Sequence, residues 1–146
     1  MRASPRSLAR FLALALVATA CKDSNGPEKP GAPVDIRVSA GDNQKGAAGA
    51  ALVAPIAAKV TDAKGHGVPG VEVTFTPEAG TVAPVQVQTN GSGVAFTTWT
   101  MPTVAGTYSV RASFIDAATG ALIDTVSFHA KVIGGTPAAM YPLSDF

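Results

Sequence analysis

The side chains that could take part in chemistry are few and widely separated. The 146 residues include two histidines and one cysteine. A nucleophilic triad needs a serine or cysteine, a base and an orienting acid. The turn around Ser92, Asn-Gly-Ser-Gly, lacks the first glycine of a G-x-S-x-G elbow and a following helix. His66 falls in a glycine-rich turn and His129 on the polar side of an expected strand, so we interpret both as solvated surface residues. No catalytic residue is predicted.

The sequence predicts no metal site and no cofactor. Zinc needs three or four ligands, and Cys21 is separated from the histidines by a proline-rich stretch. Asp42, Asn43 and Asp62 carry oxygens that suit calcium, but no loop repeats acidic residues at calcium-binding spacing. Turn capping is the interpretation that we favour for them. The remaining carboxylates of the expected domain stand singly and form no evident acid-base pair: Glu72, Glu78, Asp116 and Asp124.

Residues 1–20 have the pattern of a secretory signal. A leader with three arginines precedes the apolar run 11–17, which is too short to span a bilayer, and the small residues 18–20 suit a cleavage site. Cleavage between Ala20 and Cys21 would leave 126 residues with eight basic and ten acidic side chains. A short amphipathic helix of a cytosolic protein is the alternative.

Cys21 is the chain's single cysteine, so no disulfide can form within the chain. Residues 17–21, Val-Ala-Thr-Ala-Cys, resemble the lipobox of bacterial lipoproteins, although Ala18 stands where leucine is usual. The resemblance implies cleavage between Ala20 and Cys21 and acylation of the Cys21 thiol, which would hold the protein on a membrane. The ordinary signal peptidase would cut the same bond, and a free cysteine at the new N-terminus is then the alternative.

After the cysteine, residues 22–33 contain three prolines, two glycines and no hydrophobic face. We interpret residues 21–33 as the lipid attachment site and a flexible linker, which could reach roughly 35 to 40 Å in extended form. We expect one domain over residues 34–133, followed by a C-terminal tail over 134–146.

The centre of the expected domain is a strand, a turn and a strand. Residues 56–61 and 71–76 alternate between apolar and polar side chains, the period of a half-buried strand. Glycine and proline crowd the connection between them, which indicates a turn. Asn90-Gly91 is the favoured pair of a tight hairpin. Residues 40–51 are interpreted as a loop with a short edge segment, and 77–84 as a loop.

Further alternating runs complete an all-β pattern with no convincing helical stripe. They cover residues 34–39, 85–88, 94–101, 107–114 and 125–132. About seven short antiparallel strands with frequent turn signals are typical of an immunoglobulin-like β-sandwich. The run 94–101 is ambiguous, because Val94 and Phe96 are apolar on one side and a second set is apolar on the other. If Val94 and Phe96 are exposed, we expect a docking patch for a partner; a single exposed phenylalanine is the alternative.

Ordered motifs over about residues 33–133 resemble the bacterial immunoglobulin-like domain, group 1, of the invasin and intimin type. The motifs are Thr61-Asp62-Ala63-Lys64-Gly65, Val68-Pro69-Gly70-Val71-Glu72-Val73-Thr74-Phe75, Gly93-Val94-Ala95, Gly106-Thr107-Tyr108 and Val110-Arg111-Ala112. The resemblance implies a rigid extracytoplasmic module without catalytic residues. It also implies that Ala95, Thr97 and Trp99 point inward, which leaves Val94 and Phe96 on the outer face.

We therefore predict a non-enzymatic surface module, anchored by lipid, of the structural or adhesion type. The alternative is a carbohydrate- or peptide-binding module of the cell envelope, with a protein or polysaccharide partner. Nucleic acid is not an expected partner, because the basic residues stand singly and no aromatic stacking series accompanies them. A hydrolase would need a pocket that gathers His66 or His129 with a serine and a carboxylate.

Overall fold

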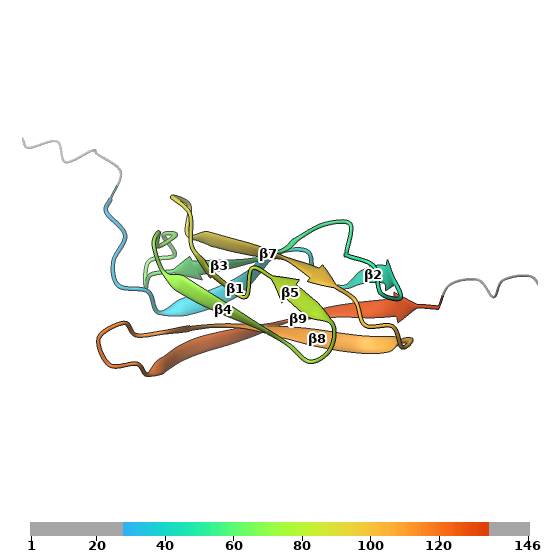
Figure 1. The fold of residues 1–146 in the computed structure, drawn as a ribbon. Coiled ribbons are helices and arrows are strands. Elements are labelled where there is room, and N and C mark those ends of the chain that lie inside the picture. Colours follow the sequence, from blue (N-terminus) through green and yellow to red (C-terminus); the bar gives the residue numbers. More distant parts are fainter. Residues whose placement is uncertain (1–27, 135–146) are drawn as a thin grey trace, which may run out of the picture.

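A computed structural model describes residues 28–134, which form nine β-strands in two sheets (Figure 1). No helix that could cross a membrane is found in this part of the chain. The strands are β1 (Asp35–Ala40), β2 (Gln44–Ala47), β3 (Ile56–Thr61), β4 (Glu72–Pro77), β5 (Thr81–Ala83), β6 (Gln86–Gln88), β7 (Val94–Thr100), β8 (Gly106–Ile115) and β9 (Leu122–Ile133).

The two sheets confirm the predicted all-β immunoglobulin-like sandwich. One sheet has the strand order β1-β3-β7-β5 and the other β2-β9-β8-β4-β6. Every pairing is antiparallel except that of β2 with β9, which is parallel. The structure has nine strands where the pattern indicates about seven. One of the additions is β5, inside the stretch interpreted as a loop, because a three-residue strand is too short to display a period of two.

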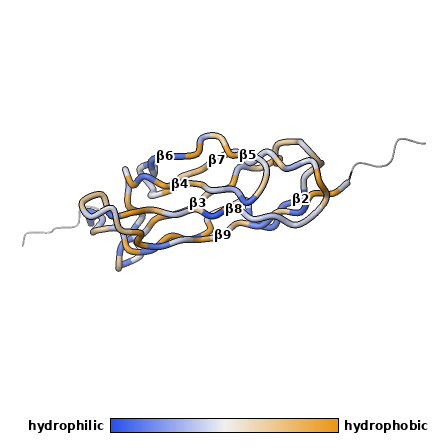
Figure 2. Tube along the Cα trace, turned by 60° about the horizontal axis from the view of Figure 1, so that its bottom comes forward, coloured by the Kyte–Doolittle hydropathy of each residue, from blue (hydrophilic) through white to orange (hydrophobic). Residues whose placement is uncertain are grey.

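The core lies between the sheets and follows the alternation of the sequence, which is visible as changes of colour along the strands (Figure 2). Trp99, Phe75 and Phe128 are completely buried, and Phe114 is nearly so. The rings of Phe75 on β4 and Phe128 on β9, two strands separated by β8, have centroids 6.5 Å apart. These aromatic side chains bury large apolar surfaces that stabilise the sandwich.

The central strand-turn-strand unit does not form a hairpin. β3 lies in the four-stranded sheet and β4 in the five-stranded sheet, so the connection between them crosses from one layer to the other. The Asn90-Gly91 turn likewise joins β6 to β7 across the layers, contrary to the expected tight hairpin. Alternation predicts a strand but does not tell which sheet contains it. The side chains of the two strands therefore meet face to face instead of edge to edge.

The two crossing connections pack backbone against backbone. Gly93 accepts a hydrogen bond through its carbonyl oxygen from the Val60 N–H, at 2.8 Å. Gly67 forms a β-bridge with Thr61. A Cβ added to Gly67 would lie 2.0 Å from the Ser92 carbonyl oxygen, so only glycine fits at this crossing.

The first strand differs from its pattern. Ile36 is buried at 3% exposure, but Val38 is 39% exposed and Val34 is 47% exposed. The register of β1 against β3 shifts between Val38 and Ala40, which is a β-bulge at the edge of the sheet. Val34 precedes β1 and Val38 lies just before the bulge on this edge strand. Ile36 is the one apolar residue of this run that enters the core.

Candidate functional site

The outer face of β7 carries Val94 and Phe96, the two residues of the predicted docking patch. Phe96 is 52% exposed and Val94 is partly exposed, whereas Ala95, Thr97 and Trp99 are buried. This is the facing that the family resemblance implies. On β3, the residue paired with Phe96 is Ala57, whose small side chain leaves the phenylalanine ring half exposed.

Two buried hydrogen bonds hold β7 in this rotation. The Thr97 Oγ1 donates to the Pro84 carbonyl oxygen at 2.6 Å, and the Trp99 Nε1 donates to the Ala79 carbonyl oxygen at 3.1 Å. Because Thr97 and Trp99 point inward, the alternating positions Phe96 and Thr98 must point outward. The exposure of Phe96 is therefore fixed by inward-facing polar contacts as well as by packing.

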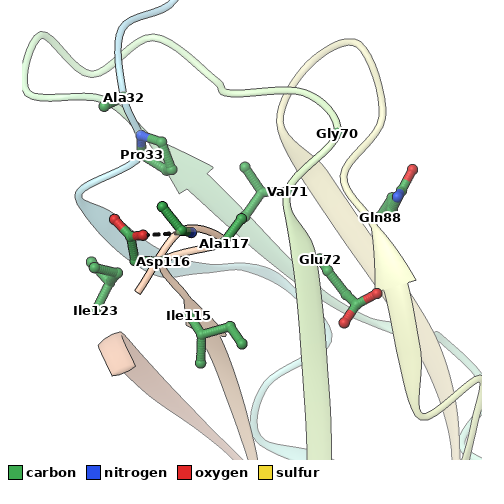
Figure 3. A pocket seen from close by; sticks show the side chains of 11 residues that line it. Ala32, Pro33, Gly70, Val71, Glu72, Gln88, Ile115, Asp116, Ala117 and Ile123 are labelled. Carbon is green, nitrogen blue, oxygen red and sulfur yellow. Dashed lines mark hydrogen bonds between the residues drawn. The ribbon is translucent and has the colours of Figure 1, made fainter. Parts of the chain in front are cut away.

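A second candidate surface is an apolar groove at the end of the sandwich where the described chain begins (Figure 3). Its volume is about 580 Å³. Five separate segments line it: residues 32–33, 70–72, Gln88, 115–118 and Ile123. We call this hollow the end groove. Ile115 and Ile123 are 51% and 39% exposed, so apolar surface is open to solvent there.

The lining of the end groove is suited to binding rather than to catalysis. It contains no histidine, cysteine or serine, and its carboxylates are Glu72 and Asp116. The Asp116 carboxylate accepts hydrogen bonds from the N–H groups of Ala118 and Thr119, at 2.8 and 2.9 Å. These contacts lower the pKa of Asp116, that of Thr119 being the larger cause. The carboxylate therefore serves to shape the β8–β9 turn.

Ala32 and Pro33 in the wall of the end groove belong to the segment 28–33, which we call the strap. The Gly31 N–H donates to the Asp62 Oδ2 at 2.8 Å, and the Val34 N–H donates to the Thr61 carbonyl oxygen at 2.9 Å. Glu28 contacts the Lys64 ammonium at 3.0 Å. The last part of the expected linker thus packs on the domain. No local sequence pattern predicts these contacts.

Asp62 is a buried carboxylate that organises both the strap and the turn after β3. Its Oδ1 accepts from the N–H groups of Lys64 and His66, each at 2.9 Å. Its Oδ2 lies 3.3 Å from the His66 Nδ1, besides the bond from Gly31. The turn-capping interpretation of Asp62 is therefore correct, and the same carboxylate also binds a segment 31 residues away.

These contacts hold the pKa of Asp62 far below its usual range. The largest cause is the Gly31 N–H, and the N–H groups of His66 and Lys64 act in the same direction. Donors to a carboxylate favour its charged form. Together they outweigh burial, which by itself would raise the pKa.

We expect this depressed pKa to make stability depend on acid. Because the pKa of Asp62 is lower in the folded chain than in the unfolded chain, its contribution is complete above about pH 4 and is lost as the pH falls further. Asp62→Asn should be less stable than wild type at pH 7, and the difference should shrink at pH 2.5. Urea unfolding at both pH values measures it, with Glu72→Gln, at an exposed position of β4, as a control. An Asp62→Asn deficit of equal size at both pH values would contradict the assignment.

The two histidines lie at separate places on the surface. His66 belongs to the Asp62 network, and the His129 Nδ1 lies 3.6 Å from the Asp42 Oδ1. Within residues 28–134, neither ring is hydrogen-bonded to a hydroxyl or thiol. No three side chains of the histidine, cysteine and acidic types gather there in a metal-binding arrangement. The predicted cleavage and lipidation site, Ala20 and Cys21, lies outside the described residues.

Comparison with known proteins gives a family and a set of similar structures. The family model for the bacterial Ig-like domain (group 1) matches residues 40–129. No curated protein matches the chain. The D00-D0 domain of intimin is 23% identical, with a TM-score of 0.47 over 71% of this chain and 50% of that one. The D0-D1 domain of intimin is 25% identical, with a TM-score of 0.47 over 68% and 49%.

A third similar structure is a C-terminal 282-residue fragment of intimin in complex with the intimin-binding domain of the translocated intimin receptor. It is 24% identical, with a TM-score of 0.46 over 67% of this chain and 33% of that one. The chain thus matches half or less of the length of each of these intimin structures. The family match covers more than half of the chain, which therefore belongs to the group 1 family of bacterial immunoglobulin-like domains.

Proposed function

We propose that this protein is a non-enzymatic module of the cell surface or periplasmic face, held on a membrane by lipid on Cys21. The observation that carries the proposal is the order of features in the chain. A signal-like segment ends at the single cysteine, and the domain of the surface-module family follows a short linker. Export places such a domain outside the cytoplasm, and two or three acyl chains are enough for stable anchoring.

Lipidation is tested by metabolic labelling of the full chain with a radioactive fatty acid. We expect label on the wild type in the membrane fraction and none on Cys21→Ser, because the thiol is the point of attachment. Ser24→Ala, three residues away, serves as the matched control and should keep its label. An unlabelled wild type would remove the lipid anchor from the proposal.

We also propose that Val94 and Phe96 form a docking patch for a protein partner. Phe96→Ser should change the free energy of unfolding by less than about 1 kcal/mol, because the ring is half exposed. Phe128→Ser, which places a hydroxyl in the closed core, should cost more than about 3 kcal/mol. Urea unfolding followed by the fluorescence of the single tryptophan compares them. A large loss for Phe96→Ser would show that the ring belongs to the core.

A carbohydrate-binding function would not rest on an aromatic row. Of the three aromatic residues that the sequence offers for one, Trp99 is buried and Tyr108 is partly buried, so Phe96 alone is exposed. Within the described chain, the polar outer face of the five-stranded sheet supports carbohydrate binding better than its exposed aromatic side chain does.

A further inference from the structure

The middle of the five-stranded sheet presents an outer face with an unusual composition. β8 and β9 pair over almost their whole length, with Thr107 opposite Lys131 and Ser113 opposite Thr125. The outward positions from Thr107 to Ser113 and from Thr125 to Lys131 are all serine, threonine, histidine, lysine or arginine. We call these positions, together with Lys45 on the adjacent β2, the polar strip. Its members on β8 and β9 include neither a carboxylate nor an apolar side chain.

Three cations of the polar strip lack a counter-charge. Lys45 and Lys131 are direct partners in the parallel pairing of β2 with β9. Like charges opposite each other destabilise a sheet. Among residues 28–134, neither lysine and no atom of Arg111 takes part in an ion pair. The folded domain therefore contains a repulsion between Lys45 and Lys131, which a bound anion would reduce.

The spacing of these cations suits an extended polymer. Arg111 is four residues along β8 from Thr107, the partner of Lys131. At about 3.3 Å per residue, the arginine lies roughly 13 Å from the lysine pair along the strand direction. A chain lying along β8 and β9 would therefore meet positive charge at two separate points.

The surface has two hollows at the polar strip, one beside Arg111 and one beside the Lys45–Lys131 pair. The first, of about 400 Å³, is lined by Arg111, Ser109 and Ser127 together with residues 76–78. The second, of about 200 Å³, is lined by Lys45, Thr107, His129 and Lys131 together with residues 43–44 and Ala130. Serine and threonine hydroxyls therefore border both groups of cations, and they can donate to or accept from sugar hydroxyls.

One carboxylate, that of Glu78, lines the first hollow, and it already accepts hydrogen bonds from Ser109. The Glu78 Oε2 accepts hydrogen bonds from the Ser109 N–H and from the Ser109 Oγ, at 3.1 and 3.0 Å. The guanidinium of Arg111 makes no hydrogen bond to any described residue, Glu78 included. Glu78 thus has donors of its own, and Arg111 is open to an external anion.

We propose that the polar strip binds an acidic polysaccharide, with anionic groups on Arg111 and on the Lys45–Lys131 pair and sugar hydroxyls on the serines and threonines between them. The shared chemistry is an extended chain that carries carboxylate or phosphate groups. The inference rests on the proposed function only in requiring that the domain lie outside the cytoplasm. Binding is measured in solution on the full chain with Cys21→Ser, so lipidation and polymer binding can fail separately.

The test compares retention by polygalacturonate, poly(glycerol phosphate), neutral dextran and duplex DNA in affinity electrophoresis at two salt concentrations. We expect retention by polygalacturonate and none by dextran. Retention by poly(glycerol phosphate) alone, which carries phosphates but no sugar, would overturn the assignment to a polysaccharide. Raising the salt should weaken retention by polygalacturonate. The triple variant Lys45→Gln/Arg111→Gln/Lys131→Gln should bind at least about tenfold more weakly.

The control is Lys29→Gln/Arg37→Gln/Lys59→Gln, which removes the same charge from other surfaces. It should lose less than about twofold in affinity, because these residues lie outside the polar strip. Equal losses in the two triple variants would overturn the proposal by showing an effect of net charge alone. No retention by either acidic polymer, or equally strong retention by DNA or dextran, would also overturn it.

Discussion

Replacement of Trp99 by alanine is expected to lower the free energy of unfolding by about 3 to 5 kcal/mol, the largest effect of any single truncation in this domain. The indole is completely buried and is the largest such side chain. Its removal leaves a cavity between the sheets and deprives the Ala79 carbonyl oxygen of the donor that lies 3.1 Å away. Urea unfolding followed by circular dichroism measures the loss.

Trp99→Phe separates the two contributions. The phenylalanine ring fills most of the space but cannot donate a hydrogen bond, so we expect a smaller loss of about 1 to 2 kcal/mol. Thr98→Ala, at the neighbouring exposed position, is the control and should change stability by less than about 0.5 kcal/mol. Trp99→Ala with a loss below about 1 kcal/mol would be incompatible with an indole at the centre of the core.

Gly67→Ala is expected to cost about 2 to 4 kcal/mol, although it adds a single methyl group. The new Cβ would lie 2.0 Å from the Ser92 carbonyl oxygen, and a backbone atom cannot move aside as a flexible side chain can. Gly93→Ala should cost a similar amount, because its Cβ would lie 2.6 Å from Gly67 and its φ is +78°.

Gly91→Ala provides the matched control in the same turn. A Cβ at Gly91 has no atom within 4 Å, so we expect a change of less than about 0.5 kcal/mol in either direction. Thermal unfolding of the three variants makes the comparison. If Gly67→Ala were as stable as Gly91→Ala, the backbone contact between the two crossing connections would be refuted.

Much of the fold could be predicted because strands with one buried face, such as β4 and β8, show that burial in their alternation. Val73 and Phe75 on β4, and Val110 and Ala112 on β8, are buried as their spacing of two predicts. The pairing of strands was not predictable in this way. Whether β3 pairs with β4 depends on contacts between residues distant in sequence, and a glycine-proline turn suits a hairpin and a crossing alike.

The candidate surfaces were less predictable than the strands. The outward facing of Phe96 follows from a family resemblance, since the alternation of β7 has an apolar residue on both faces. The end groove could not be anticipated, because it forms where the strap, β4 and the β8–β9 turn meet. The repulsion between Lys45 and Lys131 depends on the parallel pairing of β2 with β9. The one available signal was the polar alternation of β8 and β9, which fits any solvent-facing strand equally well.

The docking of the strap has a consequence for the height and orientation of an anchored domain. With residues 28–33 packed on the sandwich, six residues separate Cys21 from the packed segment, and this connection can span no more than about 25 Å. With so short a connection, the groove end of the sandwich would lie close to the bilayer. The end where β9 finishes would point outward (Figure 1). Under the proposed anchoring, the bond from Gly31 to Asp62 thus limits how far the domain can stand from the membrane.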